Sequence, residues 1–280
     1  MIGRRTVLAA LGSAALSRGA ERFRGPLGIE LYSLRREMAK DVPGTLATVR
    51  RLGFGEVEVP GFYNLTAAAF RKELDRAGLK ATAMVAQDEA LRKDLRGVAD
   101  EAHTLGTEYV IYPWIPHRSE TFDAEAALRA SEEMNRWGGA LRNANLSFCY
   151  HAHGYEFARH KGGTVFDVMA EKTDPAAVNF QLDTFWVAWA GQDPVALLNR
   201  YPRRMLLAHL KDVRKGEKGG STGHAPEETS VALGAGAIDF RAFLRDAKKA
   251  GVKRYYIEDE APAAAAQIPQ SLQYLRNLAF

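Results

Sequence analysis

Two histidines and a glutamate follow an apolar run near the middle of the chain. The run 146–150 leads directly into His151 and His153, and Glu156 comes three residues later. Side chains alternate along a β-strand, so two histidines spaced in this way share one face of a strand. Imidazole and carboxylate groups bind divalent metals and transfer protons. The end of this predicted strand is therefore a candidate reactive site.

Similar polar groups stand at the ends of other apolar runs. They are Glu58 in the run 56–59, Asp183 in 177–183, His209 and Lys211 in 204–212, Glu258 in 254–259, and Glu260 directly after it. A single carboxylate in such a place commonly caps a helix or is a surface charge. That explanation does not account for four aligned groups on successive strands: His151, Asp183, His209 and Glu258.

These four groups combine nitrogen and oxygen donors. Such a set suits Mn²⁺, Co²⁺, Fe²⁺, Ni²⁺ or Zn²⁺ better than Ca²⁺, which prefers oxygen ligands. We therefore expect one bound divalent ion, with Mn²⁺ favoured and Mg²⁺ also allowed. The single cysteine, Cys149, excludes an internal disulfide and a cysteine-based zinc cluster, and its place before His151 predicts core packing.

Aromatic side chains accompany the polar groups. Trp114 ends an apolar run, and Phe185 and Trp186 follow Asp183. Flat apolar surfaces beside carboxylates suit sugar rings, which present C–H faces and hydroxyl edges. We predict a small-molecule carbohydrate as the partner, bound by these three aromatic residues and by His153. The alternative for His153 is a histidine satisfied by neighbouring carboxylates.

Strand and helix patterns alternate along the chain after Pro26. Strands are predicted at 27–34, 56–59, 79–86, 109–114, 146–153, 177–183, 204–212 and 254–259. Helices are predicted at 43–53, 66–78, 88–105, 123–144, 164–172, 193–200, 238–250 and 267–278. Eight such units predict an α/β fold, a (β/α)₈ TIM barrel in a single domain, whose active site lies at the carboxyl ends of the strands. No G-x-G-x-x-G follows the first strand, which argues against a dinucleotide-binding sheet.

The basic character of the chain is confined to its N-terminus. Residues 1–24 carry five arginines and one glutamate, which accounts for the whole formal charge of +4, so residues 25–280 are neutral overall. A nucleic-acid partner is therefore not expected. Arg4 and Arg5 precede a short apolar stretch, which is typical of a twin-arginine signal segment and is too short for a stable membrane span. We expect export to the periplasm, or a cytoplasmic protein if the segment is only a frayed N-terminus.

Seven segments, in order, resemble the sugar phosphate isomerase/epimerase family of xylose isomerase-like TIM barrels. They are GIELYSLR (28–35), EVEVPGFY (56–63), YHAHGYEF (150–157), QLDTFWVAWAGQDP (181–194), HLKD (209–212), IDF (238–240) and YYIEDEAP (255–262). The likeness covers about residues 27–278 and is specific for the superfamily rather than for one reaction. It implies one divalent metal held by His151, Asp183, His209 and Glu258. It also implies pocket positions for Glu156, Lys211 and Trp186.

Two positions depart from the family pattern. Ketose epimerases of this superfamily usually have a glutamate as the ligand on the fifth strand, where this chain has His151. Family members also often have a histidine at the end of the third strand, where this chain has Gln87. Both differences argue against a simple epimerisation between two carboxylates.

The sugar chemistries of the superfamily share the removal of a proton α to a carbonyl, assisted by a metal acting as a Lewis acid. Our candidates for proton transfer are Glu58, Glu156, Lys211, Glu258 and Glu260. We predict a divalent-metal-dependent isomerase or epimerase that acts on a carbohydrate through an enediolate-type intermediate. The alternatives are a lyase or hydratase acting on keto-sugars or keto-glycosides, and a non-catalytic sugar-binding or partner subunit. A homo-oligomer is an open alternative to a monomer.

The loop 214–232 is rich in glycine and charge, and it follows the strand that carries His209 and Lys211. We expect this loop to close over the pocket. The alternative is a solvated insertion.

Overall fold

Eight parallel strands close into a barrel. The structure, a computed structural model, describes residues 22–117 and 122–279. The strands are β1 (Leu27–Glu30), β2 (Glu56–Val59), β3 (Lys80–Val85), β4 (Tyr109–Tyr112), β5 (Ser147–His151), β8 (Val178–Asp183), β9 (Met205–Leu210) and β12 (Arg254–Ile257). Their order around the barrel is β1-β12-β9-β8-β5-β4-β3-β2. The predicted (β/α)₈ barrel is confirmed.

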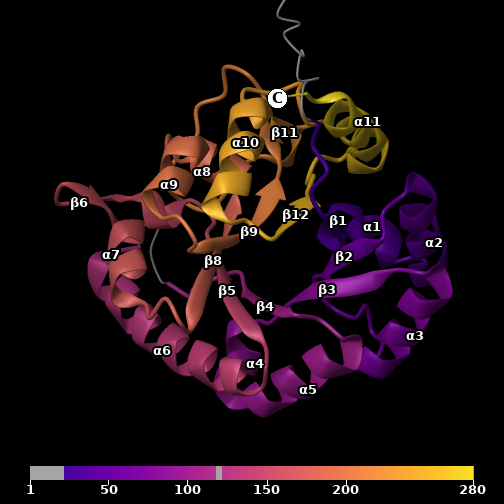
Figure 1. Ribbon diagram of the computed structural model, residues 1–280, viewed down its shortest axis with the longest axis horizontal. Helices are drawn as coiled ribbons and strands as arrows, with labels where there is room; N and C mark the ends of the chain where they lie inside the picture. The colour runs from indigo at the N-terminus through magenta and orange to yellow at the C-terminus, as the bar shows by residue number, and fades with distance from the viewer. Residues whose placement is uncertain (1–21, 118–121, 280) are drawn as a thin grey trace, which may run out of the picture.

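Helices surround the strands (Figure 1). They are α1 (Arg35–Met38), α2 (Val42–Leu52), α3 (Ala67–Ala77), α4 (Asp88–Lys93), α5 (Leu95–Leu105), α6 (Ala124–Asn143), α7 (Val165–Lys172), α8 (Thr184–Trp189), α9 (Pro194–Arg200), α10 (Phe240–Ala250) and α11 (Ala264–Asn277). Three 3₁₀ turns, η1 (Leu31–Leu34), η2 (Tyr155–Phe157) and η3 (Glu227–Thr229), lie in the connections. Two short antiparallel ribbons also do so: β6 (Arg159–His160) with β7 (Gly163–Thr164), and β10 (Asp212–Val213) with β11 (Ser230–Val231).

Side-chain caps fix where the predicted helices begin and end. Asp41 accepts a hydrogen bond from the first turn of α2, and Thr66 does the same for α3. Gly53 and Gly78 end these helices at φ of 101° and 69°, in the left-handed region that favours glycine. These local signals place the helix ends within a residue or two of the expected positions.

The structure differs from the prediction where a strand turns into a polar loop. The first strand ends at Glu30 and continues as η1, and the fifth ends at His151, so His153 lies in the following turn. The long helix expected at 88–105 is divided at Asp94, whose side chain accepts a hydrogen bond from Gly97 N and so starts α5. In each case a capping or turn residue ends the strand or helix earlier than the spacing of its hydrophobic residues predicts.

The barrel interior below the site is filled with apolar side chains. The cluster consists of Ala83, Tyr109, Ile111, Cys149, Leu207 and Tyr256, and Cys149 is fully buried within it. The predicted packing role of this cysteine agrees with that position. A closed core of this kind gives the strand ends a rigid base.

The predicted signal segment lies almost entirely outside the described residues. At its end, Arg22 pairs with Ala279 and the Phe23 ring meets Tyr255 edge-on at 5.2 Å. Export and the compartment therefore stay predictions. Within the described residues, none of the helices has the length and apolar character that a membrane span needs.

Candidate active site

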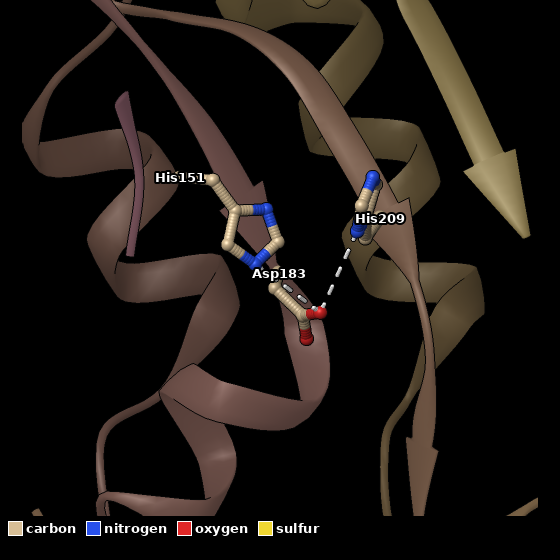
Figure 2. Close-up of side chains that lie close together, drawn as sticks. All are labelled: His151, Asp183 and His209. Atoms are coloured by element: carbon tan, nitrogen blue, oxygen red, sulfur yellow. Dashed lines mark ion pairs between the residues drawn. The ribbon is translucent and has the colours of Figure 1, made fainter. Parts of the chain in front are cut away.

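The carboxyl ends of β5, β8 and β9 bring three predicted ligands together. His151, Asp183 and His209 each offer one donor atom, and these atoms lie within 4.8 Å of one another. Asp183 is level with His209 in the register between β8 and β9. Figure 2 shows the Asp183 carboxylate between the two imidazoles, with Oδ2 at 3.9 Å from His151 Nε2 and 3.8 Å from His209 Nδ1.

Glu258 joins this cluster from the chain directly after β12. Its Oε2 lies 3.0 Å from His209 Nδ1. Burial alone would raise the pKa of Glu258, but the charges of Lys211 and His209 hold that pKa well below its usual value. The four side chains predicted as metal ligands therefore meet at one end of the barrel.

A divalent metal fits this cluster. Asp183 Oδ2 is buried and has no hydrogen-bond partner, whereas Oδ1 accepts from Trp186 N and caps α8. A buried carboxylate oxygen without a partner is costly, and a bound cation is a direct explanation for it. Two imidazole nitrogens face the same oxygen. Donors of this mixture suit first-row transition metals and zinc and do not select one of them.

Two buried glutamates, Glu58 and Glu30, lie beside His209. Glu58 Oε1 is 3.0 Å from His209 Nε2, and Glu30 completes a cluster of buried donors with them. Burial raises the pKa of Glu30 well above its usual value, and the charge of Glu58 adds to this effect. Burial would also raise the pKa of Glu58, but His209 lowers it. Glu30 is therefore the member of this pair with the raised pKa, and Glu58 is the member with the lowered pKa.

Lys211 is buried beside the cluster. Its Nζ donates to Glu260 and lies 3.4 Å from Glu258 Oε2. It also lies 5.0 Å from the ring centres of Phe185 and Trp186. Burial would lower the pKa of Lys211, but the two carboxylates hold it above its usual value. The ammonium group is thus held charged by the residues around it.

A cavity of about 390 Å³ opens onto these groups. Three of the predicted substrate-binding residues line it: Trp114, His153 and Trp186. The fourth, Phe185, does not line this cavity, because its ring is stacked on Trp189 at 5.6 Å and packs beneath Lys211. The proton-transfer candidates that line the cavity are Glu58, Glu258 and Glu260.

Glu156 lies outside the cavity, in contrast to its predicted part in proton transfer. Its Oε1 accepts hydrogen bonds from the Tyr150 hydroxyl and from His153 N, the latter at 3.2 Å. The side chain is fully buried, and burial raises its pKa to about 7. In this position Glu156 holds the turn that carries His153 rather than contacting a substrate.

Replacing Glu156 by glutamine should change how stability depends on pH. The folded-state pKa of about 7 exceeds the ordinary value of 4.5, so the carboxyl group stabilises the fold below about pH 4.5 and loses this contribution as the pH rises through about 7. The stability of the wild type relative to Glu156→Gln should therefore fall by roughly 3 kcal/mol between about pH 4.5 and pH 8. Urea unfolding of both proteins at several pH values measures this difference. A difference that does not change with pH would contradict the buried position.

The loop after β10 forms part of the cavity wall. Gly223, His224 and Ala225 line it, and Trp189 Nε1 donates to His224 O at 3.1 Å. Further along, Glu227 pairs with Arg35 at 2.6 Å. The loop therefore contributes to the cavity wall, and its closure over the pocket stays a prediction.

A methyl group at Gly223 should displace the lid. Gly223 has a φ of 76°, and a Cβ there would lie 2.8 Å from ring atoms of Trp114 and Tyr155. We expect Gly223→Ala to lower kcat/KM by about tenfold to a hundredfold, because small displacements of substrate-positioning groups have such costs. Gly216→Ala is the matched control, since Gly216 has a φ of 84° with no atom within 4 Å of its Cβ position. Equal effects of the two substitutions on steady-state kinetics would show that the lid contact has no role.

Two site residues received no role from the sequence pattern. Gln181 stands two residues before Asp183, and Glu30 ends β1. Both are buried, and Glu30 lines the cavity. The spacing of Gln181 from Asp183 was the available signal, because residues two apart on a strand share a face.

Comparison with known proteins agrees with this architecture. The model of the family described as xylose isomerase-like TIM barrel matches residues 46–278. The chain belongs to this family. This xylose isomerase-like TIM barrel is 27% identical over 210 residues to an inosose dehydratase from Geobacillus kaustophilus. The match covers 62% of this chain and 66% of that protein.

Two solved structures share the fold. A sugar phosphate isomerase/epimerase from Parabacteroides distasonis is 24% identical with a TM-score of 0.75, and the match covers 95% of this chain and 96% of that one. The IolI protein, solved with a bound zinc atom, is 16% identical with a TM-score of 0.68, and the match covers 89% and 96% of the two chains.

Proposed function

We propose that the protein is a metal-dependent lyase that eliminates water from an unphosphorylated keto-sugar or cyclic keto-polyol. The observation that carries this proposal is the Lys211–Glu260 pair, which lies beside the candidate metal ligands at the cavity. The inosose dehydratase relative supports elimination over the isomerase or epimerase that the sequence pattern favoured. His151, in place of the usual glutamate, also removes one of the two carboxylates that epimerisation uses.

The residues that would hold the metal are His151, Asp183, His209 and Glu258. When bound, a divalent ion there supplies Lewis acidity to the carbonyl and hydroxyl oxygens of the substrate. The carbohydrate stays within reach of the flanking side chains because Trp114 and Trp186 form walls of the cavity.

Glu260 is the proposed proton-transfer group. Its carboxylate takes the proton from the carbon α to the carbonyl, and Lys211 keeps that carboxylate in place. The electron pair of the broken C–H bond forms the double bond, and the C–O bond at the β carbon breaks. Glu260 then returns the proton to the departing hydroxyl, which leaves as water. The reaction balances without an oxidant, a reductant or a co-substrate.

His153 is placed to bind a hydroxyl group of the substrate. It lines the cavity, and its Nδ1 is buried without a hydrogen-bond partner. The ring is held between Trp114 and Trp186, at 5.5 and 5.4 Å between ring centres. A carbohydrate hydroxyl would satisfy the free nitrogen, which fits a polyhydroxylated substrate.

The charges around the cavity favour a neutral substrate. Among the described residues, those that line it include carboxylates, histidines and Tyr32 but no lysine or arginine. The nearest lysine, Lys211, already pairs with Glu258 and Glu260, and Arg35 pairs with Glu227. Phosphate esters are bound in proteins by free cations or by backbone N–H groups. We therefore propose an unphosphorylated substrate.

A substrate panel tests the proposed function. The metal-loaded protein is incubated in D₂O with an inosose, a 3-keto-glycoside, a ketohexose and the ketohexose phosphate, and the products are analysed by mass spectrometry. Loss of water, or of the glycosidic group, from a neutral substrate supports the lyase. Deuterium incorporation without elimination would establish an isomerase or epimerase instead. Sugar binding without either reaction would establish a non-catalytic subunit, and preferred turnover of the phosphate would refute the neutral substrate.

A further inference from the structure

A buried side-chain amide connects the two candidate histidine ligands. Gln181 lies on β8, level with His151 of β5. Its Oε1 is 2.8 Å from His151 Nδ1, and its Nε2 is 2.6 Å from Glu58 Oε2. The other oxygen of Glu58 lies 3.0 Å from His209 Nε2. A continuous hydrogen-bonded chain therefore runs from His151 through Gln181 and Glu58 to His209.

The chemistry of the groups fixes the direction of each bond in this chain. An ionised carboxylate only accepts hydrogen bonds, so Glu58 must receive the amide N–H of Gln181. The amide oxygen of Gln181 then faces His151, so His151 Nδ1 carries the proton and donates it. His151 Nε2 is left with its lone pair free, and this is the nitrogen nearest Asp183 Oδ2.

The same carboxylate orients the second imidazole. Glu58 Oε1 accepts the proton of His209 Nε2, so that His209, when neutral, presents the lone pair of Nδ1 to a ligand. His209 Nδ1 is the nitrogen that faces both Asp183 and Glu258. One carboxylate and one amide thus select opposite ring nitrogens in the two histidines, and both selected nitrogens face the same buried oxygen.

We infer that Gln181 and Glu58 form a single positioning unit that sets the tautomers of both histidines for metal binding. This inference rests on the metal site of the proposed function but not on the lyase reaction. It assigns Glu58 to orienting His209 rather than to proton transfer. Partners of this kind commonly raise metal affinity by about 10- to 100-fold.

The first test measures metal affinity. Gln181→Leu removes both hydrogen bonds at similar volume, so the Kd for Zn²⁺ measured by calorimetry should rise by about 10- to 100-fold. Asn179→Leu is the matched control, because Asn179 is also an amide on β8, lies two residues earlier on the same face, and donates to Phe148 O rather than to a histidine. We expect the control to retain the wild-type Kd. An unchanged Kd in Gln181→Leu, or no Zn²⁺ binding by the wild type, would overturn the inference.

The second test reads the tautomer in the metal-free protein and does not depend on activity. In Glu58→Gln the new amide offers its oxygen to His209 Nε2, so its NH₂ group faces Gln181. Gln181 must then turn its own NH₂ group toward His151 Nδ1, which can only accept it as the Nε2–H tautomer. Long-range ¹H–¹⁵N spectra of histidine-labelled protein should show His151 as Nδ1–H in the wild type and Nε2–H in Glu58→Gln. The same tautomer in both proteins would refute the unit, whatever reaction the enzyme catalyses.

Discussion

Replacing His209 by alanine should abolish tight metal binding and turnover together. His209 Nδ1 lies 3.8 Å from Asp183 Oδ2 and 3.0 Å from Glu258 Oε2, so its loss removes the nitrogen that faces both carboxylates. We expect the Kd for Mn²⁺ or Zn²⁺ to rise by at least about 100-fold, above the range seen when only a ligand's hydrogen-bond partner is lost. Calorimetry and metal analysis of the purified protein measure this effect.

His153→Ala is the control for this substitution. His153 lines the same cavity, and its ring centre is 4.5 Å from that of His151, but it is not one of the clustered donors. The His153→Ala variant should bind the metal with an affinity within a few-fold of the wild type, and it should bind the substrate more weakly. Similar metal loss in both variants would mean that the histidines act only by general packing. Circular dichroism should show a retained barrel in each, because the apolar core lies below the site.

Replacing Glu260 by glutamine should separate chemistry from metal binding. The amide can still accept a hydrogen bond from Lys211 Nζ, but it cannot take a proton from the substrate. General acid–base groups commonly contribute about 10²- to 10⁴-fold to a rate, and we expect kcat to fall by that factor with an unchanged Kd for the metal. Single-turnover kinetics with the substrate found in the panel would measure the loss.

The matched control is Glu228→Gln, which makes the same change at an exposed residue of the loop 214–232. It should leave kcat within about twofold of the wild type, as surface substitutions usually do. A kcat for Glu260→Gln that equals this control would remove Glu260 from the mechanism. The buried Glu30, which also lines the cavity, would then be the next proton-transfer group to replace.

The sequence was sufficient to predict the barrel and the meeting of three candidate metal ligands at one end of it. Strand periodicity placed His151, Asp183 and His209 at strand ends, and a closed parallel barrel brings such ends to one rim. Trp114 and Trp186 line the cavity for the same reason. These positions follow from the periodicity of each strand, combined with the rule that the carboxyl ends of parallel strands meet at one rim of a closed barrel.

Side chains beyond the strand ends were less predictable. Glu156 is buried because the turn at Gly154, with a φ of 98°, directs the chain back under His153. Phe185 points away from the cavity because Asp183 starts α8 directly after the strand. In both cases a local turn sets the direction of the side chain, and the spacing of hydrophobic residues does not indicate that direction.

The pairing of Glu58 with His209, and the bridging role of Gln181, depend on contacts across the barrel. Glu58 and His209 are separated by 151 positions in the chain, and Gln181 reaches Glu58 across 123 positions. Neither β2 and β9 nor β2 and β8 are adjacent strands. Their side chains meet only because the barrel closes, so spacing in one sequence does not indicate that they touch.

Anomalous diffraction from crystals grown with Mn²⁺ or Zn²⁺ tests the candidate metal centre most directly. The predicted result is one ion bound by His151 Nε2, Asp183 Oδ2, His209 Nδ1 and Glu258, with donor distances of about 2.0–2.3 Å. Such an ion would also satisfy the buried oxygen of Asp183 that lacks a partner. An ion held instead by Glu30, Glu58 and His209 Nε2, or no ion at either cluster, would contradict the account.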